Sequence, residues 1–170
     1  GITQAPHTAL HIGGSTTFVA DTKVAQLATL TSSVNQFGGA VSFTTRNGGS
    51  WSDVAVVTPT ALQMGATTVS GNMTLTATSG AITQSGPIAV AGTTSLVAID
   101  DNILLNDVNN VFVGRVSVET PKALQLTSSG ALSMGVVNVG LTSDLVSQGV
   151  LDMGTQSVYT GKLTAKSGGF

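Results

Sequence analysis

The densest group of side chains that can bind a metal lies between residues 100 and 110. This segment contains the carboxylates of Asp100, Asp101 and Asp107, together with several asparagine amides. Calcium takes about six to eight oxygen ligands, so the segment is a candidate calcium site. Its spacing lacks the Gly-x-Asp repetition of calcium-binding β-rolls, and Asn and Asp side chains also cap backbone groups at turns. We therefore expect an Asn/Asp-rich corner and no cofactor, with calcium as the alternative.

The other acidic residues are dispersed, and most stand singly beside turn-forming residues. Hydrolases and lyases that adopt a β-helix need two carboxylates, or a carboxylate and a base, on one face. The sequence shows no such pair, and nothing beyond the presence of Ser, His and Asp supports a nucleophile with its base. We predict no catalytic residues and a protein that is not an enzyme.

His7 and His11 share the parity of one strand, so both imidazoles are expected on the same side. Two imidazoles that lie close together could bind a transition metal. Strand spacing separates these two by about 13 Å, and no third ligand is evident. We expect surface or crevice positions for both.

The single tryptophan, Trp51, follows a flexible turn at residues 47–50 (NGGS). An exposed indole at this position could stack on a sugar ring, as it does on many carbohydrate-binding surfaces. The same side chain could instead cover the edge of the core beneath its loop. We favour the covering role and keep Trp51 as the candidate carbohydrate contact.

The composition excludes several kinds of partner. Only 8% of the residues are charged, against about 25% in a typical soluble domain. Six Lys and Arg residues and a net charge of −2 leave no basic cluster that could neutralise nucleic-acid phosphates. Cysteine is absent, so neither a disulfide nor a thiolate metal site can form. The longest apolar runs, such as residues 54–57, are far shorter than the roughly 20 residues of a membrane span.

Signals for β-strands occur along the whole chain, and helix signals are nearly absent. β-branched residues and glycine are poor helix formers, and no window sustains an apolar spacing of three to four. Residues 16–20, 40–44, 72–76 and 115–119 alternate small or polar with apolar side chains. Strands with one buried face have this alternation. Glycine- and asparagine-rich turns separate them.

Internal repeats favour a solenoid over a sandwich or a barrel. Three motifs recur in the same order roughly 70 to 80 residues later: residues 2–4 as 82–84, 35–42 as 110–117, and 61–65 as 131–135. Such repeats predict a right-handed parallel β-helix with roughly 20 residues per coil, about eight coils, and about four coils per long repeat. Because the sequence starts and stops in mid-pattern, without a signal peptide, we interpret residues 1–170 as one solenoid segment excised from a longer chain.

Three of these strings resemble the degenerate repeats of filamentous-haemagglutinin-like exoproteins: residues 80–86 (GAITQSG), 72–76 (NMTLT) and 35–41 (NQFGGAV). The resemblance implies a right-handed parallel β-helix on the bacterial cell surface, often exported by two-partner secretion. It also implies roles in attachment, biofilm or shaft-like display, and it carries no shared catalytic residue. The second copy of the Phe-Gly-Gly motif departs from the pattern at residues 112–114 (FVG), so that corner is expected to differ.

We therefore expect a non-enzymatic structural or adhesive segment of a secreted, extracellular bacterial fibre or filament. Its expected partners are further copies, joined end to end or laterally through the open strand edges, and cell-surface glycans. The alternatives are a carbohydrate-binding or carbohydrate-cleaving β-helix and a segment of a phage or virus fibre. A groove lined by Trp51, Tyr159 and convergent Asp residues would support the carbohydrate alternative.

Overall fold

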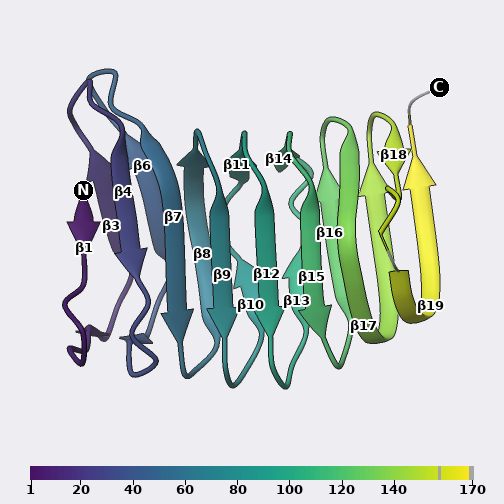
Figure 1. Cartoon of the computed structure of the whole chain (residues 1–170), viewed down its shortest axis with the longest axis horizontal. Helices are drawn as coiled ribbons and strands as arrows, with labels where there is room; N and C mark the ends of the chain where they lie inside the picture. Colours follow the sequence, from purple (N-terminus) through teal and green to yellow (C-terminus); the bar gives the residue numbers. More distant parts are fainter. Residues whose placement is uncertain (157, 169–170) are drawn as a thin grey trace.

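The chain folds into a stack of short parallel strands, which Figure 1 shows with β1 at one end and β19 at the other. The computed structural model describes residues 1–156 and 158–168. These residues include no helix, and so none long and apolar enough to cross a membrane. The strands form a parallel β-solenoid of about 7 turns that follow one another at ~21 residues. The predicted all-β solenoid is therefore confirmed.

Each turn carries three strand positions, which we name faces A, B and C in chain order. Face A contains β1 (Ile2–Thr3), β4 (Gln26–Leu30), β7 (Trp51–Thr58), β9 (Met73–Ala77), β12 (Thr94–Ala98), β15 (Val116–Thr120), the middle of β17 (Leu132–Ser147) and the start of β19 (Val158–Ser167). Face B contains β2 (His11–Ile12), β5 (Gln36–Phe37), the start of β8 (Leu62–Val69), β10 (Ile82–Gln84), β13 (Ile103–Leu105), β16 (Leu124–Ser128) and the ends of β17 and β19. Face C contains β3 (Thr16–Ala20), β6 (Val41–Thr45), the end of β8, β11 (Ile88–Val90), β14 (Val111–Phe112), the start of β17 and β18 (Leu151–Asp152).

The core consists of apolar columns that run along the stack. One column on face A contains Leu30, Val56, Leu75, Leu96 and Val118, which pair in register from turn to turn. Each of these side chains is at most 3% exposed. Successive strand residues point to opposite sides, so the alternation in the sequence places these residues inside and their Thr and Ser neighbours outside. Burial of the apolar columns is therefore the main source of stability.

The turns are not uniform in length. Ile2 pairs with Ala28, and Ala28 pairs with Val54, so the first two turns are longer than ~21 residues. The connections β1–β2, β3–β4 and β6–β7 are longer than the matching connections β10–β11, β12–β13 and β15–β16, whereas β4–β5 is as long as β13–β14. Because these connections use more residues per turn, the chain makes about 7 turns, close to the eight or so that we expected.

The long sequence repeat spans three turns and one further face, where about four turns were expected. Three steps along face A lead from Ile2 through Ala28 and Val54 to Met73. The second copy of the ITQ motif begins later, at Ile82, which pairs with Leu62 on face B. The expectation was wrong because it assumed one coil length throughout, whereas the first turns are longer.

Candidate functional site

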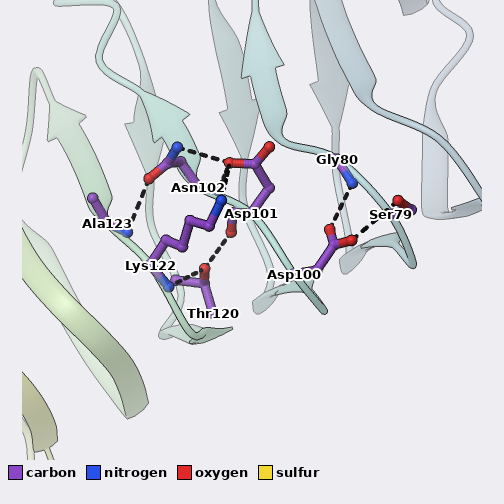
Figure 2. A network of polar contacts seen from close by, with 8 residues as sticks. All are labelled: Ser79, Gly80, Asp100, Asp101, Asn102, Thr120, Lys122 and Ala123. Atoms are coloured by element: carbon purple, nitrogen blue, oxygen red, sulfur yellow. Dashed lines mark hydrogen bonds and ion pairs between the residues drawn. The ribbon is translucent and has the colours of Figure 1, made fainter.

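The carboxylate of Asp100 lies at the corner between faces A and B, two residues after the end of β12 (Figure 2). It accepts hydrogen bonds from the backbone N–H of Gly80 at 2.7 Å and from the hydroxyl of Ser79 at 3.0 Å. Both donors belong to the preceding turn. These bonds, first of all the one from Gly80, hold the pKa of Asp100 below its ordinary value of 3.8. Asp100 therefore joins two neighbouring turns at this corner.

Asp101 and its neighbours extend the same corner toward the following turn (Figure 2). The Asp101 carboxylate accepts the backbone N–H and the side-chain amide of Asn102, both at 2.8 Å. Its ion pair with Lys122, at 3.7 Å, is exposed and contributes little. The carbonyl of Asp101 accepts the hydroxyl of Thr120, and Asn102 accepts the N–H of Ala123 at 3.0 Å. Polar groups therefore link three successive turns along the corner.

Asp107 lies at a different corner, between faces B and C. Its carboxylate accepts hydrogen bonds from the backbone N–H of Asn109 at 2.9 Å and from the Asn109 side-chain amide at 3.1 Å. The Asp107 side chain therefore caps a backbone N–H of its own turn. The candidate calcium ligands Asp100, Asp101 and Asp107 are therefore divided between two corners. No group of three or more carboxylate, His or Cys side chains that could hold a metal occurs within residues 1–156 and 158–168. Each of these carboxylates accepts hydrogen bonds from backbone N–H groups at its corner, and calcium binding stays an untested alternative.

Two amide pairs that the sequence did not reveal lie at the corners of the stack. Gln84 and Asn110 exchange two hydrogen bonds of 2.9 Å, and Gln4 and Asn35 exchange two of 2.6 and 2.9 Å. Both asparagines are fully buried. Each pair joins the last residue of an ITQ motif to the first residue of an Asn-x-Phe motif. The recurrence of both motifs was visible in the sequence, and their pairing was not.

Trp51 is buried, with 1% of its surface exposed. Its ring packs edge-on against Phe43 at a centroid distance of 5.6 Å, and its Nε1 donates to the carbonyl of Thr44 at 2.9 Å. Phe43 in turn stacks on Phe18 at 5.1 Å. An indole held in this way offers no ring face to a sugar, so Trp51 has the covering role that we favoured. Tyr159 is exposed, but it belongs to β19 at the end of the stack, which β9, β12, β15 and β17 separate from β7 (Figure 1).

A groove of about 290 Å³ runs along the axis beside the buried Trp51. Its wall includes Thr68, Ala89 and Val111, which pair in register on face C, and Val113 at the following corner. None of its lining residues is charged. The groove therefore lacks the convergent Asp residues that carbohydrate cleavage requires.

A more open cavity of about 520 Å³ lies between the loop that precedes β2 and the loop that precedes β5. It is lined by residues from 4–7 and 31–34, among them His7. His11 lies apart from it on β2, where its Nδ1 is 3.2 Å from the side-chain oxygen of Gln36. Both imidazoles are exposed, as expected.

The three-faced stack, its apolar columns and its polar corners define the chain as a β-solenoid repeat protein. A family model agrees with this class: the family described as "Repeats of unknown function (DUF5649)" matches residues 1–44 and 52–119. The match covers more than half of the chain, which therefore belongs to this family. Neither the curated proteins nor the solved structures include a match to the chain. The finer resemblance to filamentous-haemagglutinin-like adhesins stays a prediction.

Proposed function

We propose that this chain is a structural, non-enzymatic segment of a secreted bacterial surface fibre. The observation that carries the proposal is the continuous face A, in which each strand from β1 to β19 pairs in parallel with the next. Backbone hydrogen bonds of this kind run along the axis, so the stack resists bending and extension as a unit. A rod of stacked turns is suited to holding other parts of a surface protein away from the cell.

The surface of the rod supports self-association. Only 8% of the residues are charged, so two copies that approach meet little electrostatic repulsion. Among the described residues, β1 pairs with β4 and β19 pairs with β17, each along one edge, and a further strand can pair along the other edge. In our proposal the contacts are end to end or lateral, and outward Thr and Ser side chains make weak repeated contacts with cell-surface glycans.

Electron microscopy of the native material tests this proposal. We expect long, thin filaments with the width of a single solenoid. Isolated globular particles of the size of this chain would contradict a role in a fibre. Measuring the mass of the chain in solution separates the phage-fibre alternative, because an obligate trimer is expected for that class and not for a single rod.

A second test addresses the mechanical role directly. Proteases cleave chains that open locally, and stacked strands open rarely. We expect residues 51–147 to survive digestion while the longer loops near the N-terminus are cut first. Rapid cleavage throughout this central part would show that the stack is not rigid enough for the proposed role.

A further inference from the structure

The solenoid is built from units that each begin one face further around the axis. Strands β1–β9 form the first unit, and they occupy ten strand positions because β8 contributes two. Strands β10–β17 form the second unit and also occupy ten, because β17 contributes three. Three positions make a turn, so each unit ends one face beyond three full turns. The first unit therefore begins on face A, the second on face B, and β18 begins on face C.

Irregular features recur at equivalent places, which shows that the two units correspond. The ladder shifts register between Val41 and Phe43 in the first unit, and between Val116 and Val118 in the second. The paired strand carries a glycine beside each shift. A Cβ on Gly65 would lie 2.1 Å from the Ser42 hydroxyl, and one on Gly135 would lie 2.4 Å from the Ser117 hydroxyl. The amide pairs described above also occupy equivalent positions.

The beginning of a third unit is recognisable at β18. In the second unit, the carbonyl of Ala81 just before β10 accepts the N–H of Leu62 at 2.9 Å. The carbonyl of Val150, just before β18, accepts the N–H of Leu132 at the same distance. Leu62 and Leu132 are equivalent residues of the repeated ALxMG motif. Strands β18 and β19 therefore form the first turn of a third unit.

Within residues 1–156 and 158–168, no further turn stacks on β18 and β19, whereas later turns cover the two earlier units. Ile82 and Ile88, which begin the first two strands of the second unit, are fully buried. Their counterparts Leu151 and Val158 are only partly buried. Leu163, at the end of the column that contains Leu124, is 42% exposed. Burial of these apolar side chains favours the addition of another turn.

We propose that the edge of β18 and β19 is an interaction surface for the second turn of another repeat unit, entering with its first strand on face C. In both complete units, the strand that pairs with the first strand of the unit is the first strand of its second turn. Ala28 of β4 pairs with Ile2 of β1, and Ile103 of β13 pairs with Ile82 of β10. The occupant is therefore a segment equivalent to residues 26–77, from a second copy of this repeat. The proposal rests on the fibre role, because it specifies how the fibre continues.

Two fusions of the full chain test this register. In the in-phase fusion, residues 24–80 are appended after residue 170, so that β4 follows at the loop length found after β3. In the out-of-phase fusion, residues 1–57 are appended, which gives the same length but begins with a unit start. Hydrogen exchange of the backbone amides in β19 is measured in both. We expect exchange to slow by about tenfold or more in the in-phase fusion and to change less in the other.

A substitution in each fusion separates register from non-specific stacking. Met153 occupies the place of Gln4 and Gln84 in the third unit, next to the position that the appended Asn35 reaches in phase. The substitution Met153→Gln should restore an amide pair and slow exchange further in the in-phase fusion alone. Equal protection in both fusions, or equal effects of the substitution, would overturn the proposed register. Native filaments could still be seen in that case, so the fibre role would stand or fall separately.

Discussion

The side-chain amides of Gln84 and Asn110 exchange two hydrogen bonds between neighbouring turns, each 2.9 Å long. Asn110 also accepts the backbone N–H of Ile88 at 2.8 Å and donates to the carbonyl of Leu105 at 3.2 Å. All of these groups lie at or beside a buried corner. One amide therefore satisfies two backbone groups and joins two turns, at a point where the chain changes direction and the strand ladder is interrupted.

We predict that Asn110→Ala lowers the free energy of unfolding by about 2 to 4 kcal/mol, because it leaves buried polar groups without partners. Asn109→Ala is the matched control, since Asn109 is exposed and its side chain, among the described residues, bonds to Asp107 alone. The control should change stability by less than about 0.5 kcal/mol. Urea unfolding of both variants measures the difference. Equal stability of the two variants would show that the amide pair contributes nothing.

Thr94 is a buried threonine whose hydroxyl has no hydrogen-bond partner in the part of the chain that the structure describes. It lies in an inward column of face A between Met73 and Val116. We predict that Thr94→Val raises the free energy of unfolding by about 1 kcal/mol, because a methyl group replaces an unsatisfied hydroxyl of similar size. A destabilised variant would mean that the hydroxyl is satisfied in solution.

Thr58 provides the contrast for this measurement. It is equally buried on face A, but its hydroxyl donates to the carbonyl of Asn35 at 3.0 Å. Thr58→Val should therefore lower stability by about 1 to 2 kcal/mol. The opposite signs of the two substitutions, measured under the same conditions, test the hydrogen bond and exclude an effect of side-chain volume.

The sequence predicted the strands well and the partners of individual residues poorly. The alternation in β9 identifies Met73 and Leu75 as inward residues without any knowledge of neighbouring turns. The partner of Gln84 depends on how many residues the intervening turn contains, and loop lengths vary by several residues. The burial of Trp51 depends on Phe43, which lies on the preceding strand across the β6–β7 corner. Such contacts are fixed by loop lengths, corner geometry and the stacking of turns, which the alternation within one strand does not encode.

The carboxylate of Asp100 links pH to stability at one corner. Its pKa is lowered in the folded chain, so the group stabilises the fold above its ordinary pKa of 3.8. This contribution is lost as the pH falls through the lowered folded pKa. We predict that wild type has a higher melting temperature than Asp100→Asn at pH 7, and that the difference shrinks at pH values below 3.8. Ser79→Ala removes one hydrogen-bond donor to Asp100 and should reduce the pH dependence of the melting temperature. A melting-temperature difference between wild type and Asp100→Asn that is constant with pH would contradict this mechanism.

Glycines stack on one another at the corner between faces C and A. A Cβ on Gly92 would lie 2.4 Å from the carbonyl oxygen of Gly71, and one on Gly114 would lie 2.2 Å from that of Gly92. These neighbours are backbone atoms of the adjacent turns, so they cannot rotate away as a flexible side chain could. The corner therefore requires residues without a side chain in three successive turns.

We predict that Gly92→Ala lowers the free energy of unfolding by about 1 to 3 kcal/mol, because the added methyl must push two turns apart. Gly130→Ala is the control, since a Cβ at that glycine meets no atom within 4 Å. The control should be neutral or slightly stabilising, because alanine restricts the unfolded chain more than glycine does. Thermal unfolding of both variants gives the comparison. If Gly92→Ala is tolerated as well as Gly130→Ala, the turns must be able to separate at this corner, and close stacking of glycines would not be what sets the spacing there.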